Sequence, residues 1–153
     1  MQFTTWRLVS RSSGLGGVLC LAFLLAALAG GCGPAEQPGP PPEFQETSSG
    51  LKYRIRREGT GPYPQVGNLV RVHYRGWLED GTVFDTTYDS GETAAMFLDK
   101  TIPGWQEGVP LCRQGGAIEL ISPPELGYGP AGNSMIPPNA TLHFLIEVDE
   151  VIK

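Results

Sequence analysis

The sequence predicts an α+β fold with an antiparallel sheet of about five strands and one short helix. Three observations predict it. Several segments alternate apolar and polar residues with the period of two that is typical of half-buried strands. An Asp80-Gly81 pair between two of these segments is typical of a tight hairpin, so the neighbouring strands should run antiparallel. One stretch, residues 102–110, carries helix signals at both ends.

Each expected strand has one apolar and one polar face. In the second of them, Val70, Val72 and Tyr74 alternate with three basic or histidine residues. His73 and the later His143 fall on polar faces, so we expect both rings to be solvated. The five strands are expected in residues 51–59, 68–81, 82–88, 116–122 and 141–152.

The expected helix, "IPGWQEGVP" at residues 102–110, is short and poor in helix-forming residues. Pro103 suits a first helical turn, and Gly108 weakens the interior. About two turns are not stable alone in water. Trp105 must therefore hold the helix by burial, form the floor of a binding site, or do both. A long flap, residues 123–140, precedes the last strand, and its apolar contents favour an ordered and functional loop.

The first 31 residues have the layout of a signal peptide. Arg7 and Arg11 precede an apolar run that is too short for a typical membrane-spanning helix. The run ends in "LAGGC", which resembles a bacterial lipobox with Cys32 as the lipid-attachment residue. Plain cleavage and an uncleaved anchor are the alternatives. We expect three parts: a lipoprotein signal peptide at 1–31, a Pro/Gly-rich tether at 32–49 and a folded domain at 50–153.

Charge and cysteine content exclude several functions. The formal net charge is −5, and loss of Arg7 and Arg11 would leave nine basic against 16 acidic residues. This balance argues against a nucleic-acid partner, and attachment to a membrane would come from lipid on Cys32. Two histidines and no cysteine pair at ligand spacing predict no metal site, and we expect no cofactor. Cys112 is expected to be a small buried hydrophobe.

One group of residues could carry chemistry. Aromatic and apolar side chains fall at the ends of the predicted elements with a single carboxylate, Asp85, among them. The alternative is that the apolar members simply form the core. A carboxylate beside an apolar face needs a hydrogen-bond donor if it is buried, and the Tyr74 hydroxyl is a candidate. The group comprises Tyr74, Phe84, Asp85, Ile102, Trp105, Tyr128 and Phe144.

Four motifs in order, "VHYRGWLEDGTVFD", "IPGWQEGV", "PPELGYG" and "IPPNATLHF", resemble the FKBP-type peptidyl-prolyl isomerases over residues 51–153. The resemblance implies a five-stranded antiparallel sheet wrapped around one short helix. It assigns the floor of a proline pocket to Trp105, a backbone N–H donor to Ile102 and a hydroxyl to Tyr128. Met96 and Thr101 stand where the family usually has an aromatic and an aliphatic residue. The implied catalytic residues are Asp85, Tyr128 and Phe84, and the implied substrate-binding residues are Tyr74, Met96, Thr101, Ile102, Trp105, Ile136 and Phe144.

The resemblance also implies an activity and partners. The chain should isomerise prolyl bonds and assist folding of exported proteins without covalent catalysis, nucleophile, metal or cofactor. Its partners would be proline-containing polypeptides and the macrolides tacrolimus and rapamycin, and the chain is expected to be a monomer. The alternative is a non-catalytic proline-binding or chaperone module on the same fold. The lipid anchor would place the domain on the periplasmic side of the outer membrane, with the cell surface as the second location.

Overall fold

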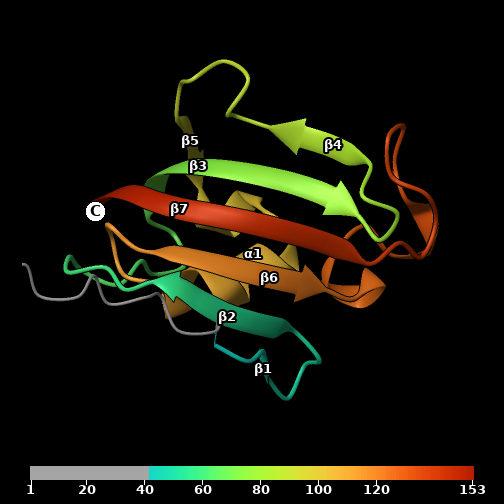
Figure 1. Cartoon of the computed structure of the whole chain (residues 1–153), viewed down its shortest axis with the longest axis horizontal. Helices are drawn as coiled ribbons and strands as arrows, with labels where there is room; N and C mark the ends of the chain where they lie inside the picture. Colours follow the sequence, from blue (N-terminus) through green and yellow to red (C-terminus); the bar gives the residue numbers. More distant parts are fainter. Residues whose placement is uncertain (1–41) are drawn as a thin grey trace, which may run out of the picture. The chain divides into compact units, whose positions relative to one another are not determined.

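The computed structural model describes residues 42–153, and the predicted α+β fold is confirmed: an antiparallel sheet packs against one short α-helix (Figure 1). The strand order is β1-β2-β6-β7-β3-β4, and β5 pairs separately with β3. The predicted signal peptide, Cys32 and most of the predicted tether lie outside the described residues. The strands are β1 (Gln45–Glu46), β2 (Lys52–Arg57), β3 (Leu69–Leu78), β4 (Val83–Thr86), β5 (Ala94–Phe97), β6 (Ala117–Ser122) and β7 (Leu142–Ile152).

The five expected strands correspond to β2, β3, β4, β6 and β7, and two further strands are present in the described part of the chain. β1 has only two residues, both polar, and it pairs with β2 through Gln45↔Tyr53 and Glu46↔Lys52. β5 pairs with the start of β3, from Leu69↔Phe97 to Val72↔Ala94. Both strands are too short for an alternating pattern to be seen in the sequence, so only tertiary pairing defines them.

The core lies between the inner face of the sheet and the helix. Val70 and Val72 of β3 are fully buried, as the alternation predicts. We expected a solvated ring for His73 on the opposite face, but the residue is half-buried. Its ring stacks on Tyr88, with 5.4 Å between the ring centroids. His143 likewise stacks, on Trp77. The buried core comprises Leu51, Val70, Val72, Leu98, Trp105, Val109, Cys112, Ile118, Leu120, Ile136, Leu142, Phe144, Ile146 and Val148.

The helix α1 (Pro103–Gly108) is followed directly by a 3-10 turn, η2 (Val109–Leu111). Another 3-10 turn, η1 (Leu98–Lys100), precedes it. Trp105, Val109 and Cys112 are all buried, so one face of this short segment is held by the core. Burial, rather than helix propensity, therefore stabilises α1. Burial also raises the pKa of the Cys112 thiol to about 11, which leaves it protonated at neutral pH.

Gly108 has a packing role that the sequence did not reveal. A Cβ atom at this position would lie 2.6 Å from Cδ2 of Leu120. In an exposed helix a Gly-to-Ala change stabilises by up to about 1 kcal/mol. Here we expect Gly108→Ala to lower the free energy of unfolding by about 1–3 kcal/mol, because the added methyl overpacks the core. Urea denaturation measures this value, and the Gly108→Ala/Leu120→Ala double variant should cost less than the sum of the two single changes.

The flap between β6 and β7 is ordered, as expected. It contains two 3-10 turns, η3 (Pro124–Leu126) and η4 (Gly129–Ala131). The Asn133 side-chain oxygen accepts hydrogen bonds from the backbone N–H groups of Met135 and Ile136, at 2.8 and 2.9 Å. These bonds turn the Ile136 side chain into the core, where it is 2% exposed. Within residues 42–153, no helix has the length and apolar character needed to span a bilayer.

Candidate functional site

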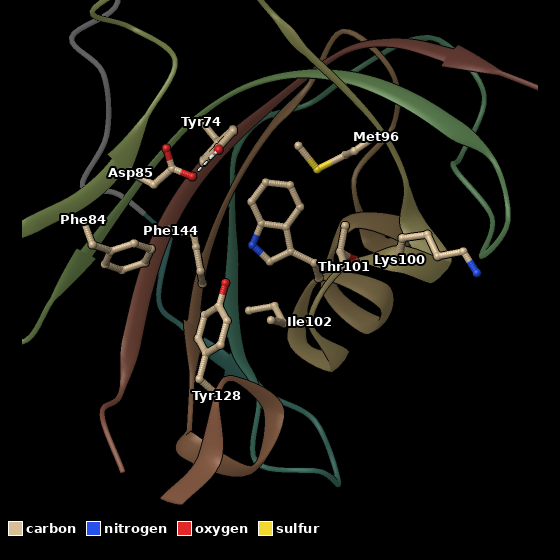
Figure 2. A pocket seen from close by; sticks show the side chains of 10 residues that line it. Tyr74, Phe84, Asp85, Met96, Lys100, Thr101, Ile102, Tyr128 and Phe144 are labelled. Carbon is tan, nitrogen blue, oxygen red and sulfur yellow. Dashed lines mark hydrogen bonds between the residues drawn. The ribbon is translucent and has the colours of Figure 1, made fainter. Parts of the chain in front are cut away.

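A cavity of about 320 Å³ opens between the end of the sheet, the start of α1 and the flap (Figure 2). Strand β3 contributes Tyr74 to its wall, and β4 contributes Phe84 and Asp85. The flap contributes Tyr128, whose side chain is 41% exposed at the mouth of the pocket. Side chains from β3, β4, β5, the segment from η1 to α1, the flap and β7 therefore build one site. Its lining residues are Tyr74, Phe84, Asp85, Met96, Lys100, Thr101, Ile102, Trp105, Tyr128 and Phe144.

Trp105 both packs in the core and lines the cavity. Its side chain is only 4% exposed. Tyr74 and Phe144 meet it in edge-to-face geometry, with ring centroids 5.1 and 5.5 Å away and interplanar angles of 86° and 87°. Phe84 continues the cluster with an edge-to-face contact to Phe144 at 5.7 Å. Such aromatic pairs have specific geometry and add to the energy of area burial, so they stabilise the arrangement of the pocket walls.

A hydrogen bond joins the one carboxylate of the pocket to the aromatic cluster. The Tyr74 hydroxyl donates to Oδ2 of Asp85 at 2.5 Å, which is the donor that the sequence suggested. Burial, and then this bond, raises the pKa of Tyr74 well above its ordinary value, so the hydroxyl keeps its proton at neutral pH. Asp85 itself is exposed rather than buried. The bond therefore orients an accessible carboxylate at the edge of the cavity.

The backbone around Tyr74 is held from β4 and the residues after it. Gly76 pairs with Asp85 across the β3–β4 ladder. The Tyr74 N–H donates to the Thr87 hydroxyl at 2.9 Å, and the Thr87 N–H donates to the Tyr74 carbonyl at 3.0 Å. Thr87 is buried, with 8% exposed. Contacts between β3 and the segment of β4 and Thr87 thus fix the two strands on either side of the Tyr74–Asp85 hydrogen bond.

Two polar groups at the helix side of the pocket are suited to orient a ligand. Ile102 precedes α1 in extended conformation, and its N–H has no acceptor within residues 42–153. Tyr128 brings its hydroxyl toward the same pocket from the flap, as Figure 2 shows. A ligand carbonyl could accept from either donor. Among the described residues, no group of three or more His, Cys, Asp or Glu side chains is placed to hold a metal ion.

All but one of the predicted pocket residues lie together in this cavity. Ile136 does not line it, because Asn133 directs the flap backbone so that the Ile136 side chain packs in the core. Lys100 lines the cavity although the sequence did not suggest it. A charged residue on a 3-10 turn has no apolar pattern to mark it, and only its position beside Thr101 could have pointed to the pocket.

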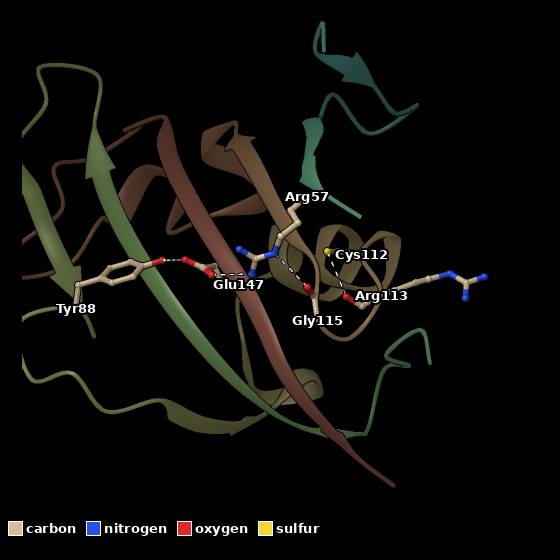
Figure 3. Close-up of polar contacts among 6 residues, drawn as sticks. All are labelled: Arg57, Tyr88, Cys112, Arg113, Gly115 and Glu147. Carbon is tan, nitrogen blue, oxygen red and sulfur yellow. Dashed lines mark hydrogen bonds and ion pairs between the residues drawn. The ribbon is translucent and has the colours of Figure 1, made fainter. Parts of the chain in front are cut away.

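The outer face of the sheet carries a polar network that anchors the segment after β4 (Figure 3). The Tyr88 hydroxyl donates to Glu147 at 2.6 Å, and Arg57 donates to the other oxygen of the same carboxylate at 2.8 Å. These two bonds hold the pKa of Glu147 below its ordinary value of 4.5, and the bond from Tyr88 has the larger effect. Burial, and then the bond to Glu147, raises the pKa of Tyr88 to about 12.

We expect this network to give acid-dependent stability. A depressed carboxyl pKa stabilises the fold above the unfolded value, and the stabilisation is lost as the pH falls through the folded value. Tyr88→Phe should therefore lower the free energy of unfolding by about 1 kcal/mol at pH 7, and the difference should narrow below about pH 4. Urea denaturation at several pH values measures both quantities. Tyr53→Phe is the matched control, because its hydroxyl donates to the uncharged Gln45 amide. A Tyr88→Phe deficit that stays constant from pH 7 to pH 3.5 would contradict the prediction.

Comparisons with known proteins agree with the fold. Residues 61–149 match the family described as FKBP-type peptidyl-prolyl cis-trans isomerase. The FKBP-type peptidyl-prolyl cis-trans isomerase FkpA of Escherichia coli (strain K12) is 46% identical over 105 residues, which are 69% of this chain and 39% of FkpA. The chain therefore spans about two fifths of the length of that relative.

Comparison with solved structures leads to the same class of protein. The crystal structure of FkpA from Escherichia coli superposes with a TM-score of 0.70 at 44% identity, covering 71% of this chain and 51% of that chain. The crystal structure of AtFKBP13 superposes with a TM-score of 0.66 at 35% identity, covering 71% of this chain and 98% of that chain. An antiparallel sheet against one short helix is thus shared with these proteins. The chain belongs to the family of FKBP-type peptidyl-prolyl cis-trans isomerases.

Proposed function

We propose that this chain is a peptidyl-prolyl cis-trans isomerase that binds the proline ring of polypeptides in the aromatic pocket. The observation that carries the proposal is the nearly buried Trp105 at a cavity whose other walls are Tyr74, Phe84 and Phe144. A proline ring is apolar, compact and rigid, so an aromatic cavity of about 320 Å³ suits it. The family membership supports the same activity.

The chemistry of the reaction fits a pocket of this kind. Resonance in the amide gives rotation a barrier of about 18–20 kcal/mol, and exchange at X-Pro bonds takes tens of seconds or more. No covalent bond to a nucleophile is required. The twisted amide has lost resonance, so its carbonyl is less polarised and requires less hydration than the planar ground state. A dry aromatic cavity therefore binds the twisted form better, which is differential binding of the transition state.

The polar groups have distinct roles in this proposal. The Ile102 N–H and the Tyr128 hydroxyl would donate to substrate carbonyls and orient the peptide across Trp105. Asp85, held by the Tyr74 hydroxyl, would shape the electrostatic field at the rotating amide rather than transfer a proton. Phe84 would complete the apolar wall on the β4 side.

The proposal is tested by Asp85→Ala and Phe84→Ala in a prolyl tetrapeptide isomerisation assay. We expect each change to lower kcat/KM by about tenfold or more, equivalent to about 1.4 kcal/mol of transition-state binding, with an unchanged circular dichroism spectrum. Asp149→Ala and Val83→Ala are matched controls, since Asp149 is exposed on β7 and neither residue lines the aromatic pocket. Unchanged rates in the folded Asp85 and Phe84 variants would refute the proposed catalytic site.

The same assay separates catalysis from binding alone. Inhibition of the isomerisation by rapamycin or tacrolimus would support a family-type pocket. A protein that binds prolyl peptides in an NMR titration without accelerating exchange would instead be a non-catalytic proline-binding or chaperone module. The apolar but non-aromatic Met96 in the pocket wall is the observation that favours this second function.

We further propose that the domain is exported, monomeric and lipid-anchored through Cys32, and that it assists folding of exported proteins. The "LAGGC" segment and the Pro/Gly-rich residues that follow support this arrangement. The periplasmic side of the outer membrane is the proposed location, and the cell surface is the alternative. Mass spectrometry of the purified full chain would detect a diacylglyceryl-modified Cys32, and Cys32→Ala should release the protein from the membrane fraction.

A further inference from the structure

Thr87 places a buried hydroxyl against the backbone of a pocket residue. Within residues 42–153, the buried polar residues are Thr87 and Ser122. Thr87 does not line the cavity, but its Oγ1 accepts a hydrogen bond of 2.9 Å from the N–H of Tyr74, which does. A ligand in the cavity would therefore touch Tyr74 and not Thr87. Any effect of Thr87 on the site has to pass through Tyr74.

The Thr87 hydroxyl replaces a backbone acceptor between the two strands. β4 ends at Thr86, so Thr87 is the first residue beyond the strand. In a regular antiparallel ladder, a hydrogen-bonded pair of residues exchanges two N–H···O bonds. Here only one of them is made, from the Thr87 N–H to the Tyr74 carbonyl at 3.0 Å. The Thr87 carbonyl instead accepts from the Gly91 N–H and the Ser90 hydroxyl, so the Tyr74 N–H is left to the Thr87 side chain.

The surrounding bonds assign the direction of the Thr87 hydroxyl proton. The Tyr74 carbonyl already accepts from the Thr87 N–H and from the Thr86 hydroxyl, at 3.0 and 3.2 Å, which fills its two lone pairs. The Thr87 hydroxyl lies 3.3 Å from this carbonyl and 3.1 Å from Nδ1 of His73. The hydroxyl therefore donates to Nδ1, and the neutral His73 ring carries its proton on Nε2. Every polar group around the Tyr74 backbone is then satisfied.

The orientation of the Tyr74 backbone sets the polar part of the pocket. The Tyr74 hydroxyl donates to Asp85, and its ring meets Trp105 edge-to-face, as described above (Figure 2). Without the Thr87 hydroxyl, the Tyr74 N–H would lose its acceptor, which is costly for a group away from water. The local backbone would shift until this N–H found another acceptor. The Tyr74 hydroxyl would shift with it and release Asp85.

We propose that the Thr87 hydroxyl is a positioning group for catalysis: it holds the Tyr74 backbone so that the Tyr74 hydroxyl keeps Asp85 correctly oriented at the rotating amide. The inference rests on the proposed isomerase function and adds a residue to it. Thr87 is not itself a catalytic residue, because it acts only through Tyr74 and does not line the cavity.

Thr87→Val tests the role of the hydroxyl, because valine keeps the branched shape and removes the oxygen. Misplacement of a catalytic group by about 1 Å can cost about 100-fold in rate, so we expect a smaller shift of Asp85 to lower kcat about tenfold. KM should stay within about twofold, because the lost interaction acts on the transition state. Thr87→Ser keeps the hydroxyl and should retain most of the wild-type kcat. Val109→Ala is the matched control for lost stability, since Val109 is fully buried and lies outside the cavity.

A double variant tests whether Thr87 acts through Tyr74. Tyr74→Phe removes the hydroxyl that bonds to Asp85 and should itself lower kcat. In this background, Thr87→Val should change kcat by less than about twofold, because residues that act as a unit are not additive. The carbon-13 NMR signal of the hydroxyl-bearing ring carbon of Tyr74 gives a second readout. It should shift in Thr87→Val and return toward its wild-type position in Thr87→Ser.

The outcomes separate this inference from the proposed function. A fall in kcat that Thr87→Ser largely avoids, and that is lost in the Tyr74→Phe background, supports it. Wild-type kcat in folded Thr87→Val, or multiplicative losses in the double variant, overturns it while the isomerase function stands. If the wild-type chain turns over no peptide, the proposed function fails. The Tyr74 signal then decides alone: an unchanged signal in Thr87→Val overturns the positioning role, and a shift that is absent from Thr87→Ser supports it.

Discussion

Replacing Trp105 by alanine is expected to lower both the free energy of unfolding and the isomerisation rate by a large amount. The side chain is 4% exposed and contacts Tyr74 and Phe144 edge-to-face. Removal of a buried Trp costs about 3–5 kcal/mol, because apolar contacts are lost and a cavity remains. The short helix α1 has little propensity to compensate. Urea denaturation should show this loss, and the isomerisation rate should fall by at least tenfold under conditions where the variant remains folded.

A matched variant separates the two roles of this side chain. Val109 is fully buried on the same helical segment, but it does not line the cavity. Val109→Ala should therefore destabilise the domain and leave kcat/KM close to that of the wild type. If folded Trp105→Ala kept wild-type kcat/KM, Trp105 would only stabilise the helix, and the proposed floor of the proline pocket would be wrong.

The second large effect is expected at Gly76 on β3. A Cβ atom there would lie 2.6 Å from Cζ of Phe84 and 3.0 Å from Cε1 of Phe144. Both rings line the cavity, so Gly76→Ala must displace a wall of the pocket. We expect a loss of about 1–3 kcal/mol in the free energy of unfolding, the usual range for overpacking. The isomerisation rate should fall by tenfold or more, because the displaced ring narrows or opens the site.

A double-mutant cycle tests the cause of this effect. Phe84→Ala removes the ring that the new methyl group would meet first. The combined Gly76→Ala/Phe84→Ala variant should then lose less stability than the sum of the two single variants. Additive losses would show that Gly76 is required for a reason other than the approach of Phe84.

Parts of the fold with a long, regular pattern could be predicted from sequence. β3 and β7 have 10 and 11 residues, and their alternation correctly identified inward side chains such as Val70 and Ile146. β1 and β5, with two and four residues, gave no such signal. His73 was expected in solvent because period two says only which face a residue takes. What covers that face, here Tyr88 from the segment after β4, depends on tertiary structure.

The residues of the candidate site could likewise be predicted only in part from the sequence. The residues that line the cavity were predicted well where motifs carried them, as with Trp105 and Asp85. Ile136 was placed in the pocket, but the turn around Asn133 directs it into the core. The backbone conformation of a long loop decides such directions, and sequence pattern does not encode it. Lys100 was missed because a charged residue on a short turn has no periodic signal.

The pairing of the pocket strands has a consequence for how the domain folds. β3 forms its longest ladder with β7, from Leu69↔Ile152 to Leu78↔Leu142, across more than half of the described chain. Contacts so distant in sequence carry a large loop-closure entropy and slow the folding of a domain. Phe144 lies on β7 and completes the aromatic wall. The binding site therefore cannot form before β7 has been synthesised, and a nascent chain that lacks β7 would have α1 and β3 without a functional pocket.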